Sequence, residues 1–167
     1  MSYVRIWIHA VFSIKDRDLQ TLNKEKRDVL ISHIRTQCSK KKIYLDAING
    51  YNEHLHLLIS LGKQQNISEI MQSIKGESSF WANQQQLFEH KLVWQDDYFA
   101  VSVSESQVEK VKNYIYSQET HHSEKSFEKE TDEFMQLFGW NKPIPNQINR
   151  QINLTAIGTK VPLKGLQ

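Results

Sequence analysis

The chain has 167 residues, of which 39% are hydrophobic and 24% charged, and its formal net charge is +2. This length fits one globular domain with a short appendage, and no apolar run approaches the roughly 18 residues of a membrane-spanning helix. The N-terminal segment lacks the pattern of a secretion signal, and Cys38 is the only cysteine, which excludes a disulfide framework and a cysteine-rich zinc module. We therefore expect a cytoplasmic protein with no membrane partner.

Charge is spread unevenly along the chain. Residues 1–45 have a balance of +6, residues 46–139 a balance of −8, and residues 140–167 carry four basic residues and no acidic one. Such asymmetry is compatible with a localised anionic partner, for which nucleic acid is the obvious candidate. A solvated surface that is merely uneven explains the charge pattern equally well.

The first half of the chain predicts one strand, one helix and a hairpin. Residues 3–14 are rich in β-branched and aromatic side chains and indicate a strand. Residues 23–42 have helical apolar spacing and end in three lysines, which the helix dipole favours. Residues 43–48 and 53–61 have strand composition, and the intervening Asn-Gly-Tyr-Asn is typical of a tight turn.

The second half predicts two helices that begin at capping boxes. Residues 66–69 (NISE) open a helix that extends to about Phe88, and residues 104–107 (SESQ) open another whose buried face includes Val108 and Ile115. Residues 93–103 between them have strand composition. A shorter amphipathic helix is expected over residues 127–138.

The predicted order is β-α-β-β-α-β-α, which favours an α+β fold with an antiparallel sheet and helices packed on one face. We expect one domain over residues 1–140. After Trp140 the chain contains all three of its prolines and little periodicity. Residues 141–167 are therefore predicted to be a basic tail that orders only against a partner or a second subunit.

The strongest local signal is the segment EHLHLLI, residues 53–59. On a strand, His54 and His56 share one face, with Cβ atoms about 7 Å apart, while Leu55, Leu57 and Ile59 share the other face. Two neighbouring imidazoles can converge on one metal ion. The alternative is an ordinary half-exposed strand, which a single His-x-His motif does not exclude.

A second signal lies on the helix that follows residues 104–107. Tyr114 and Gln118 are four residues apart, so they stack on one helical face beside the apolar stripe. A tyrosine there can act as a nucleophile, and a glutamine oxygen can complete the shell of a hard metal ion. An amphipathic aromatic residue at a packing boundary is the alternative interpretation.

Together these motifs resemble the single-tyrosine HUH transposases, which are small insertion-sequence transposases acting on single-stranded DNA, and their domesticated REP-associated relatives. The resemblance covers roughly residues 6–140, and five blocks occur in the family's order. These blocks are HAVFS (9–13), HLH (54–56), IKGESS (74–79), WQDDYF (94–99) with SVS (102–104), and Tyr114-Ile115 with Gln118 and His121-His122. The resemblance implies a ferredoxin-like sheet with the His-x-His motif on its central strand.

The resemblance also implies a site and a reaction. His54, His56 and Gln118 would hold one divalent cation, Mg²⁺ or Mn²⁺, and Tyr114 would be the nucleophile that forms a 5′-phosphotyrosine bond with DNA. Tyr116 is the other hydroxyl nearby in sequence, but it points to a different helical face, so Tyr114 is favoured. We assign no role to His121 and His122, because a polar helix end explains them.

The partners implied are single-stranded DNA, with hairpins at the ends of the element, and a second copy of the chain in a homodimer that shares its active sites. Bound to DNA, the protein would be associated with the nucleoid. Basic residues are available for phosphate contacts. The candidates are Lys15, Arg17, Lys40, Lys41, Lys42 and Lys75.

Three functions remain open at this stage. The first is a transposase that cleaves and rejoins DNA strands, and the second is a domesticated nuclease that processes hairpins for its host. The third is a catalytically inactive module that binds single-stranded DNA. A different His-x-His phosphoesterase or nucleotide hydrolase is a weaker alternative, because its chemistry would leave Tyr114 and Gln118 unexplained.

Overall fold

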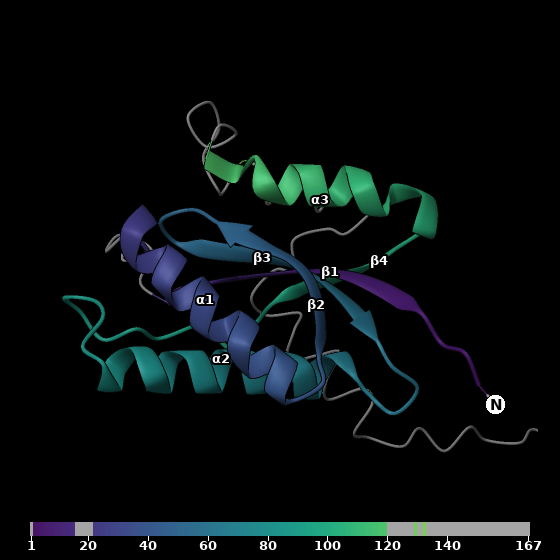
Figure 1. Cartoon of the computed structure of the whole chain (residues 1–167). Coiled ribbons are helices and arrows are strands. Elements are labelled where there is room, and N and C mark those ends of the chain that lie inside the picture. The colour runs from purple at the N-terminus through teal and green to yellow at the C-terminus, as the bar shows by residue number, and fades with distance from the viewer. Residues whose placement is uncertain (1, 16–21, 120–128, 130–131, 133–167) are drawn as a thin grey trace, which may run out of the picture. The chain divides into compact units, whose positions relative to one another are not determined.

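The computed structural model describes residues 2–15, 22–119, 129 and 132 (Figure 1). The helices and strands occur in the predicted order, within a compact unit that spans residues 1–124. They are β1 (Ile6–Ser13), α1 (Lys24–Lys40), β2 (Tyr44–Gly50), β3 (His54–Leu61), α2 (Ile67–Gln84), β4 (Phe99–Val103), a 3-10 turn (Glu105–Gln107) and α3 (Val108–Tyr116).

The four strands form one antiparallel sheet in the order β2-β3-β1-β4. This is the ferredoxin-like arrangement, and the predicted α+β fold class is confirmed. The strand that carries His54 and His56 is central, with β2 on one side and β1 on the other. In the register between β1 and β3, Ser13 lies opposite His54 and Val11 opposite His56. The two histidines therefore lie in the interior of the sheet.

One face of the sheet packs against α1 and α2, as predicted. Leu55, Leu57 and Ile59 alternate along β3 and are fully buried in this core together with Phe12 of β1. Each buried leucine or isoleucine contributes about 1.5–3 kcal/mol through removal of apolar surface from water. The alternation of β3 thus fixes the face on which its histidines must lie.

The helix α3 differs from the expectation that all helices lie on one face. It crosses the opposite face of the sheet from α1 and α2 (Figure 1). Its buried residues Val108 and Ile115 pack against Trp7, Ala47 and Leu58, which form a second apolar cluster. These strand residues alternate with those of the main core, so the sheet offers an apolar surface on both sides.

The predicted strand over residues 93–103 is shorter in the structure. Trp94 forms a single bridge with Ile14, and β4 begins only at Phe99. Trp94 points into the core, where its indole Nε1 donates to Ser78 Oγ at 3.0 Å. The Asp96-Asp97 pair follows after Gln95, and aspartate is unfavourable in strands, which explains the interruption.

The two capping boxes have different outcomes. Asn66 caps α2 as predicted, because its side-chain oxygen accepts from the Glu69 amide at 2.9 Å. The prediction of a capping box at Ser104 is wrong. The Ser104 hydroxyl bonds to the Ser106 hydroxyl instead, and a 3-10 turn precedes α3. The helix α2 ends at Gln84 rather than near Phe88, and Gln86 takes a φ of 50° in the turn that follows.

Several expectations concern parts of the chain outside the described residues. These are the helix over residues 127–138, the tail over residues 141–167, Arg17, His121 and His122. The domain boundary at residue 140 accordingly stays a prediction. Within the described part of the chain, no helix combines the length and apolarity needed to cross a bilayer.

Cys38 is expected to react slowly with thiol reagents in the folded protein. It lies buried on α1, and burial raises the pKa of its thiol to about 11, so little reactive thiolate exists at pH 8. Alkylation by iodoacetamide at pH 8, followed by mass spectrometry, checks this. We expect modification at least about tenfold faster in denaturant than in buffer. Equal rates would show that α1 opens readily at this position.

Candidate functional site

The site begins with the two histidines of β3. Because Leu55 and Leu57 face the core, His54 and His56 point to the opposite face, beneath α3. Both imidazoles are almost fully buried, and their ring centroids lie 4.9 Å apart. The strand alternation that buries the leucines therefore brings two metal-binding side chains together.

The helix α3 places Tyr114 and Gln118 above these histidines. The ring of Tyr114 lies edge-on to His56, with the centroids 5.6 Å apart. Just beyond the helix end, Gln118 is fully buried, and its Oε1 lies 3.4 Å from Nε2 of His54. The four residues predicted from the sequence thus meet in one place.

Contacts to the edge strand β2 fix the position of α3 along the sheet. Lys112 Nζ lies 3.3 Å from Asp46 Oδ2, and Asn49 Nδ2 donates to the Tyr116 carbonyl at 3.3 Å. The side chain of Tyr116 is exposed, whereas Tyr114 on the neighbouring face is half-buried beside the histidines. This geometry favours Tyr114 over Tyr116 as the residue that belongs to the site.

His9 is a member of the site to which the sequence analysis gave no role. Its Nε2 lies 3.0 Å from Nδ1 of His56, and the two rings stack with centroids 5.3 Å apart. Burial lowers the pKa of His9 to about 4, so its imidazole is neutral at pH 7. The alternation Trp7-His9-Val11 along β1 indicates the correct face, but only the register with β3 places His9 beside His56.

Glu53 lies beside the other histidine. Its Oε1 is 3.4 Å from Nδ1 of His54. Burial lowers the pKa of His54, an effect that outweighs the opposing influence of Glu53, and this favours the neutral ring that a metal ion requires. Contacts to the Nδ1 atoms of both histidines orient the rings with Nε2 toward the centre of the site.

The donor set fits a divalent cation. Nε2 of His54 and Oε1 of Gln118 converge, and Nε2 of His56 is the nitrogen opposite its bond to His9. Two imidazoles and an amide oxygen are acceptable ligands for Mn²⁺ or Mg²⁺ and leave positions for water or substrate. Among the described residues, no group of three His, Cys, Asp or Glu side chains is placed to hold a metal ion.

Those predicted phosphate-binding residues that the structure describes do not gather around Tyr114. Lys15 follows β1 and is exposed, while Lys40, Lys41 and Lys42 lie at the C-terminal end of α1. Lys41 donates to Ser73 of α2 at 2.7 Å, which places it in the helix layer on the opposite face of the sheet from α3. A DNA contact by these lysines stays a prediction.

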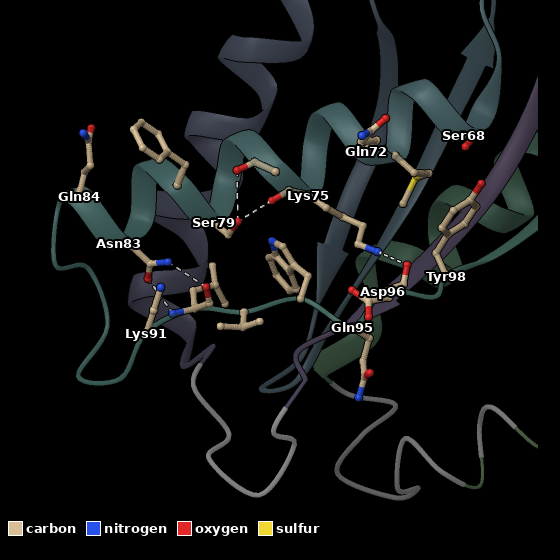
Figure 2. Close-up of a pocket in the computed structure, with 16 residues that line it drawn as sticks. Ser68, Gln72, Lys75, Ser79, Asn83, Gln84, Lys91, Gln95, Asp96 and Tyr98 are labelled. Carbon is tan, nitrogen blue, oxygen red and sulfur yellow. Dashed lines mark hydrogen bonds between the residues drawn. The ribbon is translucent and has the colours of Figure 1, made fainter. Parts of the chain in front are cut away.

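Lys75 lies in a groove of about 890 Å³ between α2 and residues 91–98 (Figure 2). Its ammonium donates to the Asp96 carbonyl at 2.7 Å and lies 5.7 Å from the centre of the Tyr98 ring. Burial is the largest influence on the pKa of Lys75 and lowers it. This lysine therefore braces the 94–98 segment against α2, and any phosphate contact competes with that role.

Fold and site together define an α+β protein of ferredoxin-like topology that combines a His-x-His strand with a tyrosine-bearing helix. The sequence matches the family model described as "Transposase IS200 like" over residues 2–118. The chain belongs to this family, and the resemblance to single-tyrosine HUH transposases is confirmed. Family membership gives it a transposase-type function.

Two solved structures are similar to this chain. A candidate transposase from Deinococcus radiodurans R1 is 26% identical, with 71% of this chain and 95% of that chain covered and a TM-score of 0.54. A REP-associated tyrosine transposase bound to a REP hairpin is 16% identical, with 73% and 72% covered and a TM-score of 0.56. The second likeness supports the fold alone. No curated protein matches the chain.

Proposed function

We propose that this protein cleaves and rejoins single-stranded DNA through a covalent 5′-phosphotyrosine intermediate on Tyr114. One observation carries the proposal. The Tyr114 ring contacts His56, while Gln118, four residues along the same helix segment, directs its oxygen at His54. A nucleophile and a cation-binding set thus share one site in a member of a transposase family.

The proposed reaction exchanges one phosphate ester for another. The Tyr114 oxygen attacks the phosphorus, its proton is lost, and the bond from phosphorus to the 3′ oxygen breaks. That oxygen takes up a proton and leaves as a free 3′ hydroxyl, while the 5′ phosphate stays on Tyr114. Because the phosphotyrosine conserves the energy of the ester, a second 3′ hydroxyl can reverse the step and join the strands without ATP.

His54, His56 and Gln118 would hold the cation in this proposal. A bound Mg²⁺ or Mn²⁺ would supply Lewis-acid chemistry toward a phosphate oxygen. The chain's own contribution is to keep the His54 imidazole neutral, because burial lowers its pKa, and to supply a ligand without charge in Gln118. Such ligands leave the net positive charge of the cation intact for the phosphate.

The proposal extends to the partners. The DNA would contain a hairpin near each end of the element, as the family resemblance implies, and the exposed Lys15 and Lys40–Lys42 would meet phosphates outside the site. A homodimer with shared active sites is also implied by the resemblance. In the described chain, however, all four site residues already meet within one copy.

Incubation of the protein with labelled single strands from both flanks of its locus is expected to give a covalent adduct that depends on metal. We expect a shifted band on a denaturing gel with Mg²⁺ or Mn²⁺, and removal of the metal by EDTA lowers its yield at least about a hundredfold. Matching duplexes are the control and give no adduct. Tight binding of single strands without any adduct would contradict the proposal and favour a binding module.

Replacement of His9 by Asn is expected to weaken the metal site without unfolding the sheet. His9 Nε2 contacts Nδ1 of His56, the ring nitrogen opposite the one proposed to bind the metal, and so orients that ring. Loss of such an outer contact costs about 10–100-fold in metal affinity. Calorimetric titration with Mn²⁺ measures this for His9→Asn. The control is His90→Ala, which changes an exposed histidine after α2, and an equal loss in both variants would exclude the orienting role.

A further inference from the structure

A groove follows α2 on the face of the sheet opposite the helix that carries Tyr114 (Figures 1 and 2). It has a volume of about 890 Å³, and residues 91–98 form its second wall. We call this hollow the α2 groove. The residues of α2 that line it lie three or four positions apart and therefore share one face of the helix, as Gln72, Gly76, Ser79 and Asn83 do. The groove is thus separate from the histidine site.

The two walls of the α2 groove are tied together by hydrogen bonds. The Asn83 side chain donates to the Leu92 carbonyl at 2.9 Å and accepts from the Leu92 amide at 2.7 Å. Lys75 makes the corresponding contact near the other end, where its ammonium donates to the Asp96 carbonyl (Figure 2). Because these contacts hold the walls apart at a fixed distance, the groove is preformed and a ligand need not open it.

The side chains of the groove suit unpaired nucleobases. Phe80 lines it and is 63% exposed, so its ring offers an unused apolar surface to the solvent. The amide side chains of Gln72, Gln84 and Gln95 line it as well and present both donors and acceptors. A base can stack on an aromatic ring and bond to amides through its edges only when it is unpaired, because a duplex covers the face and the pairing edge.

The charge of the groove suits a phosphate backbone. Among the described residues that line it, Lys75 and Lys91 are basic, and Asp96 is the acidic one. Lys15 lies next to this wall, since its amide donates to the Val93 carbonyl at 2.8 Å, and it is exposed. Lys75 is engaged with the Asp96 carbonyl. Lys15 and Lys91 are therefore the cations available to phosphates.

We propose that the α2 groove is a second DNA-binding site, which holds an unpaired strand outside the bond that Tyr114 cleaves. One base stacks on Phe80, and phosphates meet Lys91 and Lys15. Residues 68–83 of α2 span about 22 Å, which accommodates about four nucleotides. The choice of DNA as ligand rests on the proposed function. Binding in the groove does not use the metal ligands, so it is independent of the divalent cation.

The first test measures the affinity for a labelled single strand by fluorescence anisotropy in EDTA, where no adduct forms. We expect Phe80→Ala to weaken binding about tenfold, because a stacking surface is lost. Lys91→Ala should weaken it about threefold and reduce the salt dependence by about one phosphate contact. The matched control is Lys110→Ala, which removes an exposed lysine from α3 and should bind as the wild type does. Unchanged affinity in Phe80→Ala would overturn the proposal.

The second test fills the groove at Gly76. A Cβ there meets no atom within 4 Å, so Gly76→Glu extends into the groove without displacing its walls. We expect single-strand affinity in EDTA to fall at least about tenfold, with an unchanged thermal midpoint, while the control Gly76→Ala binds normally. Binding of a blunt duplex should be the same in both variants. An equal loss of single-strand affinity in both would also overturn the groove as the site.

Adduct formation with Mn²⁺ separates this inference from the proposed function. At saturating single strand, Gly76→Glu should form the adduct at the wild-type rate, because the groove residues do not touch the reacting atoms. Normal single-strand affinity in Gly76→Glu, together with a wild-type adduct, would overturn the groove and leave the proposed function standing. Groove-dependent binding without an adduct in the wild type would contradict the proposed function and support the groove.

Discussion

Tyr114→Phe is expected to lower the rate of covalent adduct formation at least about a thousandfold, because it removes only the attacking oxygen. The ring stays in place against His56, where the two centroids are 5.6 Å apart, so the fold and the cation site should be unaffected. Single-turnover assays on a labelled single strand with Mn²⁺ measure the adduct. Binding of the same strand, measured by fluorescence anisotropy, should change less than about threefold.

Tyr116→Phe is the matched control, since it makes the same chemical change two residues away. The side chain of Tyr116 is 51% exposed and lies away from the histidines, while its backbone carbonyl bonds to Asn49. We expect full activity. If Tyr116→Phe lost the adduct and Tyr114→Phe kept it, the nucleophile would be Tyr116. The helix α3 would then have to be oriented with Tyr116, rather than Tyr114, toward the histidines.

Much of the sheet and its helices was predictable from periodicity. The apolar alternation of β3 identifies both the core face and the face of the histidines, and the spacing of Val108 and Ile115 identifies the buried side of α3. The side of the sheet on which α3 packs could not be predicted in this way. It depends on a second apolar surface built by Trp7 and Leu58 from separate strands, which no local pattern contains.

The residues of the site likewise divide into those that local sequence patterns reveal and those that depend on distant parts of the chain. His54, His56, Tyr114 and Gln118 were identified from motif spacing and family resemblance, and the structure brings them together. Their functional roles stay proposals. His9 was not identified, because it acts through a residue that is distant in sequence. The register of β1 against β3 sets His9 opposite Leu58, and its ring then reaches diagonally to His56 on the neighbouring strand.

Gly50→Ala is expected to destabilise the protein by at least about 3 kcal/mol, since the new methyl group has no space. A Cβ at Gly50 would lie 2.0 Å from the His54 carbonyl oxygen and 2.9 Å from Leu55 Cα, and neither backbone atom can move without shifting β3. The β3 end displaced in this way carries the His-x-His motif. Thermal denaturation should show a midpoint lowered by roughly 10 °C, and Mn²⁺ affinity should fall as well.

Gly76→Ala is the matched control and has the opposite expected sign. Gly76 lies exposed within α2, and a Cβ there meets no atom within 4 Å. Alanine reduces the backbone freedom of the unfolded chain and favours the helix, so we expect stabilisation of about 0.4–1 kcal/mol with unchanged Mn²⁺ affinity. If both variants were neutral, the hairpin would have to relax around Gly50, and the tight approach of β2 to His54 would not be what sets the position of the histidine strand.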